Sequence, residues 1–138
     1  MKACPAWHEA LSCGFPEMDG QHQRLLEAAA RITSMLEVGP GRDGLVRAIQ
    51  ALAHDLGVHH EEEERFMRWL AFPDLEAHRA QHRGQLLRLE ALGARARWSP
   101  EDGEVDALFL AVVADTARHI DDEDRAIGAF ALGRVISA

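Results

Sequence analysis

Gly and Pro residues divide this chain into four long segments, and each segment repeats its apolar residues every three or four positions. The segments span roughly 19–37, 43–70, 74–96 and 101–121, and a shorter one spans 124–133. Such a repeat is typical of an amphipathic α-helix. Alternation of apolar and polar residues, the mark of a β-strand, does not extend over any comparable length. The sequence therefore predicts an all-α protein.

The loops between these segments are short. They contain no more than about five residues, and loops of that length join antiparallel neighbours. We expect an up-down-up-down antiparallel four-helix bundle over 19–121, preceded by an N-terminal arm (1–18) and followed by a C-terminal segment (122–138) with a short helix. With 138 residues, 47% of them hydrophobic, the chain is expected to form a single domain with one core.

Charge and composition exclude several classes of partner. The net charge is −8 and Lys and Arg do not cluster, so we expect no binding to nucleic acid or to an anionic membrane, whereas cations fit. No stretch approaches the ~18 apolar residues of a membrane span, and the N-terminus lacks the apolar core of a signal peptide. We expect a soluble, cytoplasmic protein. Cys4 and Cys13 match no metal or redox spacing and are expected to be free thiols.

The stretch "HHEEEERFM", residues 59–67, places two histidines before four glutamates. His59 and Glu63 are four residues apart, so on a helix they share one face and one metal ion is within reach of both. His60 and Glu64 have the same spacing. Spacing alone therefore leaves two candidate pairs, and the rest of the acidic run is expected to be a solvated face.

Histidines recur in the other three long segments. His78 and His82 are again four residues apart, as in the helices of zinc proteases, but the Glu of that zinc motif is missing between them. His22 lies in the first segment and His119 in the fourth. Buried imidazoles and carboxylates without partners cost several kcal/mol each, so a metal-free bundle used only for interactions is a poor alternative. Five imidazoles and two carboxylates are too many for one tetrahedral ion and suit two adjacent ions.

Four motifs of this chain resemble those of the hemerythrin family, in particular its single-domain bacterial members, over nearly the whole length. Trp7 and "MDGQHQRLLE" resemble the family's opening Trp and D-x-Q-H-x-x-L, and "HHEEEERFM" resembles H-F-x-x-E-E-x-x-M. The stretches "FPDLEAHRAQH" and "HIDDED" resemble Y-P-x-x-x-x-H-x-x-x-H and H-I-x-x-x-D. The resemblance implies seven metal ligands, which are His22, His59, Glu63, His78, His82, His119 and Asp124.

By this resemblance the cofactor would be two non-haem iron ions joined by an oxo or hydroxo bridge. His78, His82 and His119 would hold one iron. His22 and His59 would hold the other, and Glu63 and Asp124 would bridge the two. Dioxygen would bind reversibly at the iron with two histidines, inside a dry apolar pocket. The implied function is oxygen storage, delivery, scavenging or sensing rather than catalysis. No surface for a protein partner can be read from the sequence.

One assignment disagrees with regular helix geometry. His119 and Asp124 are five residues apart, which is about 140° around an α-helix. Spacing alone would favour Glu123 as the ligand. A local widening of the helix at this point would reconcile the family motif with the geometry.

The chain departs from the family at the expected pocket, which comprises His60, Asp115, Thr116 and Ile120. His60 stands where the family has Phe, and Asp115 and Thr116 stand where it has Trp and Leu. Either these polar side chains turn away from the pocket, or the pocket is wetter and His60 or Asp115 acts as a proton donor. The second possibility supports an alternative function, a redox enzyme or sensor acting on peroxide or nitric oxide. Iron buffering is a further alternative, and manganese, zinc or mixed pairs also suit these ligands.

Overall fold

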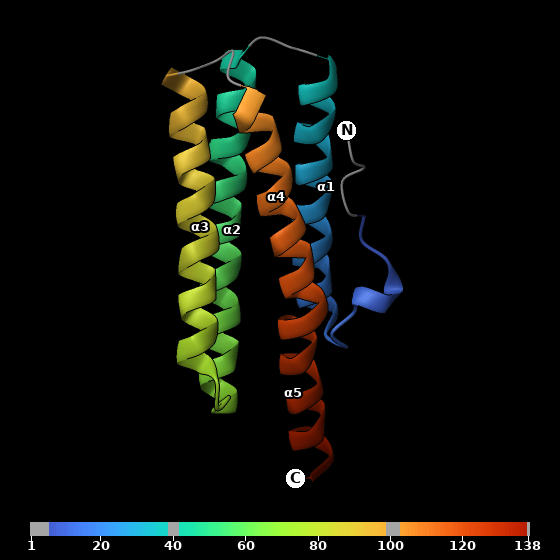
Figure 1. Cartoon of the computed structure of the whole chain (residues 1–138). Coiled ribbons are helices and arrows are strands. Elements are labelled where there is room, and N and C mark those ends of the chain that lie inside the picture. Colours follow the sequence, from blue (N-terminus) through green and yellow to red (C-terminus); the bar gives the residue numbers. More distant parts are fainter. Residues whose placement is uncertain (1–5, 39–41, 99–102, 138) are drawn as a thin grey trace.

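A computed structural model describes residues 6–38, 42–98 and 103–137 and consists almost entirely of helices. The long helices are α1 (Pro16–Val38), α2 (Arg42–Leu70), α3 (Leu75–Trp98) and α4 (Gly103–His119), which continues through the π-helical turn η2 (Ile120–Asp124) into α5 (Arg125–Ser137). A 3₁₀ turn, η1 (Glu9–Leu11), lies in the arm. The four long helices run side by side in alternating directions, with α5 extending α4 (Figure 1). The predicted all-α four-helix bundle is confirmed.

Two helix boundaries differ from the sequence-based expectation. α1 begins at Pro16, three residues early, and proline suits a first helical turn because its missing N–H would have no partner there. We expected a break between the fourth segment and the C-terminal helix, but η2 connects them without interruption. The acidic run there is part of a continuous helix.

The apolar core is divided into two parts by the predicted ligand positions. The residues of the larger cluster follow His22 in α1 and His82 in α3, and they precede His59 in α2 and His119 in α4. Ile49 and Phe109 belong to this cluster and are both 0% exposed. A smaller cluster on the opposite side contains Met67, Leu70, Ile127 and Ala131. In antiparallel helices these positions lie on opposite sides of the ligand level. The polar cluster is therefore enclosed between two apolar layers that exclude water.

The N-terminal arm packs against the bundle close to η2. Leu11 packs with Leu26 and Ile120, and Trp7 covers this group. Gly128 permits a close approach, because a Cβ atom there would lie 1.9 Å from the Cys13 carbonyl oxygen. Cys13 is a buried free thiol, as predicted, and burial raises the pKa of its thiol to about 12. Cys4 lies outside the described residues.

No helix within the described ranges has the length and apolar character needed to cross a membrane.

Candidate metal centre

All seven side chains that the family resemblance implies as ligands lie together in the interior. None is more than 8% exposed. The four long helices and η2 each contribute, and the residues form two overlapping groups that could each hold a metal ion. One group contains Glu63, His78, His82, His119 and Asp124, and the other contains His22, His59, Glu63 and Asp124. His8 and His54 are exposed.

The two carboxylates divide their oxygens between the two groups. Glu63 Oε1 lies 2.9 Å from His78 Nε2 and 3.0 Å from His82 Nε2. Its other oxygen, Oε2, lies 3.4 Å from His22 Nε2 and 3.3 Å from His59 Nε2. Each oxygen of Glu63 therefore faces a different set of histidines.

Asp124 repeats this division from the opposite side of the cluster. Its Oδ1 lies 3.1 Å from His78 Nε2 and 3.0 Å from His119 Nε2, whereas Oδ2 lies 3.1 Å from His22 Nε2. The cluster thus has two centres, one surrounded by three imidazoles and one by two. Both carboxylates span the centres.

The π-helical turn explains how Asp124 reaches this position. In a π-helix the hydrogen bonds join residues five apart, so residues at that spacing lie nearly above one another. His119 immediately precedes η2 and Asp124 is its last residue. The local widening expected from the family motif is present, and Glu123 is exposed.

The spacing of the donor atoms fits bound metal ions. Two ligands at right angles, each about 2.1 Å from an ion, lie about 3.0 Å apart. His119 Nε2 and His78 Nε2 are also 3.0 Å apart. Two imidazole nitrogens repel each other at this distance unless a proton or a cation lies between them. Imidazole and carboxylate ligands suit divalent transition metals.

Hydrogen bonds between the histidines and the two carboxylates shift several pKa values within this cluster. Burial alone would raise the pKa of Glu63, but hydrogen bonds from the surrounding histidines outweigh it and hold that pKa well below its usual range. The pKa of Asp124 is lowered in the same way, against burial and the charge of Glu63. Burial would lower the pKa of His22 and His78, yet hydrogen bonds to Asp124 and Glu63 raise both to about 9. His22 and His78 are therefore protonated near neutral pH in the metal-free protein and face both carboxylates.

Comparison with known proteins agrees with this geometry. Residues 13–131 match the family model described as "Hemerythrin HHE cation binding domain". The chain belongs to the hemerythrin family. It is accordingly a metal-binding helical protein whose buried His, Glu and Asp cluster lies within the matched region. The comparison with curated proteins gives no match.

Two further side chains orient histidines of this hemerythrin site, and the sequence analysis missed one of them. His59 Nδ1 donates to Gln21 Oε1 at 2.6 Å, and Gln21 Nε2 in turn donates to Glu62. His82 Nδ1 donates to Glu64 Oε2 at 2.8 Å. Such outer hydrogen bonds fix the ring orientation of a metal-ligating histidine. Glu64 had been considered as a ligand with His60, and Gln21 carried no signal apart from its place before His22.

His60, where the family motif has Phe, remains inside the bundle. Its ring is 5% exposed and stacks on His82 with ring centroids 3.8 Å apart. Burial, together with the electrostatic effect of the neighbouring His82 and His59 rings, lowers the pKa of His60 to about 3. The ring is therefore uncharged near neutral pH and fills the position as a flat neutral group. This does not favour the role of proton donor.

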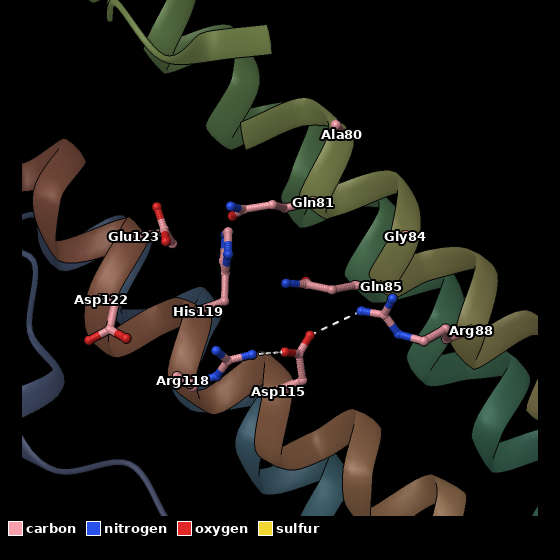
Figure 2. Close-up of a pocket in the computed structure, with 10 residues that line it drawn as sticks. All are labelled: Ala80, Gln81, Gly84, Gln85, Arg88, Asp115, Arg118, His119, Asp122 and Glu123. Carbon is pink, nitrogen blue, oxygen red and sulfur yellow. Dashed lines mark hydrogen bonds and ion pairs between the residues drawn. The ribbon is translucent and has the colours of Figure 1, made fainter. Parts of the chain in front are cut away.

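Asp115, the second departure, lies outside the apolar interior. Its carboxylate binds Arg88 Nη2 at 3.0 Å and also binds Arg118, as the dashed lines in Figure 2 show. The three side chains line a groove of about 260 Å³ between α3 and α4. Of the two alternatives for Asp115, the structure agrees with the one in which its side chain turns away from the apolar pocket, because Arg88 and Arg118 hold its carboxylate in the groove.

A separate small cavity lies in the apolar layer beside the site. It has a volume of about 20 Å³, enough for one molecule of about the size of water. Of its lining residues only Thr116 carries a polar side chain, and the others are Leu25, Leu26, Ala29, Leu52, Leu56, Leu89, Val112 and Val113. Ile120 is buried beside Leu26. The cavity begins one helical turn from His22 and from His59.

Proposed function

We propose that this protein binds dioxygen reversibly at a centre of two iron ions. The observation that carries the proposal is the unequal division of histidines between two sites that share both carboxylates. Three imidazoles face one site and two face the other. Because Glu63 and Asp124 each turn one oxygen toward each site, the site of His22 and His59 has one protein ligand fewer, which leaves a position for an exogenous ligand.

The surroundings of this position favour a small apolar ligand. Leu26 follows His22 by one helical turn, and Leu56 precedes His59 by one turn, so the cavity of about 20 Å³ adjoins the two-histidine site. An apolar cavity of this kind stays dry. Dioxygen is uncharged and small enough to occupy it, whereas ions and strongly hydrated molecules would lose their hydration there.

The side chains of this protein would contribute by holding ligands in fixed positions and excluding water. Glu63 and Asp124 would bridge the two ions, and Gln21 and Glu64 would fix the rings of His59 and His82. The bound ferrous ions would supply the electrons for the reversible reduction of dioxygen. The aliphatic lining, with a neutral His60 nearby, offers few protons to a bound ligand, and this favours release of dioxygen over its further reduction.

The test is to load the metal-free protein with ferrous iron without air and measure two ions per chain. Dioxygen is then admitted and purged with inert gas while the visible spectrum is recorded. The proposal expects an absorption band that rises with dioxygen and falls on purging over repeated cycles. A single irreversible oxidation would instead assign the centre to redox chemistry or sensing. A content of one ion or none would contradict the two-metal centre.

A further inference from the structure

The groove between α3 and α4 connects solvent with one edge of the metal centre. It is lined on the outside by exposed side chains, among them Asp122 and Glu123, and on the inside by His119 and Gln85. Figure 2 shows Gln85 extending from α3 across the groove in the direction of His119. With a volume of about 260 Å³, the groove has room for several water molecules at ~30 Å³ each.

Gln85 is an unusual residue for the inner end of such a groove. It is 2% exposed, and its Oε1 is buried with no hydrogen-bond partner among the described residues. A buried amide oxygen without a partner costs free energy, so an apolar residue would be more stable here. An amide oxygen is, however, a good ligand for a hydrated or partly dehydrated divalent cation.

Charge along the groove also suits a cation. Three carboxylates face two guanidinium groups, and both guanidinium groups are bound to the same carboxylate, that of Asp115. Asp122 and Glu123 remain at the outer end. The sequence of groups from outside to inside is therefore carboxylates, an amide oxygen and then an imidazole, which are successive replacements for the water shell of a metal ion.

We propose that this groove is the route by which divalent metal ions enter and leave the centre, with Gln85 as a transit ligand and Asp122 and Glu123 as the attracting charges. The proposal rests on the metal centre proposed above. Each predicted ligand is at least 92% buried, since none exceeds 8% exposure, so a route through the protein surface is required. The groove meets the site of three histidines at His119.

The test measures how fast the metal-free full-length chain takes up Co²⁺, followed by visible absorption, and how fast EDTA removes it. The first variant is Gly84→Leu. A Cβ at Gly84, which lines the groove, would meet only the mobile end of Arg88, 3.3 Å away. The control is Gly20→Leu, because Gly20 is also helical and its Cβ would meet the end of Arg24 at 3.4 Å. We expect Gly84→Leu to slow uptake and removal by about the same factor at unchanged final stoichiometry, and Gly20→Leu to change neither.

The second comparison tests charge. Asp122→Asn with Glu123→Gln should slow Co²⁺ uptake about tenfold at low ionic strength, and the difference should largely vanish near 1 M salt, where the Debye length is about 3 Å. The control is Glu61→Gln, an exposed glutamate that does not line the groove. Equal slowing in the control would overturn the proposal, since it would show an effect of overall charge.

Gln85→Leu separates transit from a structural role. We expect slower uptake of Co²⁺ together with a higher unfolding temperature, because an unpaired buried oxygen is removed. A higher unfolding temperature with unchanged uptake would assign Gln85 to structure alone and overturn its part in the route. If wild-type protein binds no Co²⁺, the metal centre itself fails. If it binds Co²⁺ at rates that none of the groove variants alters, the centre stands and the groove is rejected.

Discussion

Two spaces approach the metal centre from different directions, and they differ in size and in lining. The cavity beside His22 and His59 holds about 20 Å³ within aliphatic side chains. The groove that ends at His119 holds about 260 Å³ and is bordered by charged residues and amides. The first suits a small neutral ligand and the second suits hydrated ions.

Under the two proposals above, this difference would let one buried cluster exchange metal and still keep water from its ligand position. Glu63 and Asp124 lie between the two sides and contact histidines on both. A single opening for metal and dioxygen would have to be both polar and dry. Separate spaces on either side of the carboxylates would remove that conflict.

The largest effect is expected from Glu63→Gln, which removes the carboxylate between the two spaces. Glu63 is 2% exposed and contacts four histidines, so its loss leaves buried imidazolium without a counter-charge. Breaking a buried pair from one side costs about 3–5 kcal/mol. We expect that decrease in the unfolding free energy of the metal-free protein, measured in urea, and fewer than two metal ions per chain. Glu61→Gln should change stability by less than about 0.5 kcal/mol. Two retained ions in Glu63→Gln would contradict its bridging role.

The next largest effect concerns pH. The folded protein raises the pKa of His22 and His78 from 6.5 to about 9, so their stabilising contribution is complete below pH 6.5 and is lost as pH rises to about 9. The unfolding temperature of the metal-free protein should therefore fall across this range. The metal-loaded protein should show no such fall, because metal binding requires deprotonated ligands and tightens as pH rises. Parallel thermal melts with and without EDTA make the comparison, and identical profiles would argue against shared protons in the cluster.

A smaller effect is expected from exchanging one hydroxyl in the apolar cavity. Val113→Thr adds a hydroxyl at a position 4% exposed and should cost about 1–3 kcal/mol, whereas Thr116→Val removes the only polar side chain of the lining. Under the proposed function, iron-loaded Val113→Thr should oxidise irreversibly faster than wild type, and Thr116→Val more slowly. The loss of the reversible absorption band over hours gives both rates. Equal rates would show that dryness of this cavity does not protect the centre.

The smallest effect is expected from Asp115→Asn. Its side chain is 30% exposed, and its arginine partners are 54% and 72% exposed, so the pairs contribute less than about 1 kcal/mol. Because Asp115 faces the groove and not the cavity, irreversible oxidation of the iron-loaded protein should proceed at the wild-type rate. A clear change in that rate would indicate that Asp115 does act on the dioxygen pocket.

The sequence predicted the helices and the members of the cluster more completely than it predicted side-chain orientation. Apolar periodicity is set by burial and could be read directly, and the motifs named all seven clustered residues. Asp115 and Thr116 are neighbours in sequence, yet they line different spaces because their side chains point about 100° apart on α4. Which of them faces the interior depends on the rotation of α4 about its axis, and packing against the other helices sets that rotation. Gln21 lay within a polar run where no spacing distinguished it from solvated neighbours, and the spacing of Glu64 from His60 suggested a ligand and not the acceptor for His82.

The π-helical turn has a consequence for what lies beyond it. One extra residue in η2 turns every later side chain by about 100° relative to an uninterrupted α-helix. Gly128, four residues after Asp124, thereby meets the Cys13 carbonyl. If the same residues continued as a regular α-helix, Glu123 would take the place of Asp124, and Ile127 would face the arm at the place where only glycine fits. The packing of the N-terminal arm on Gly128 and the position of the Asp124 carboxylate thus both depend on the same π-helical turn.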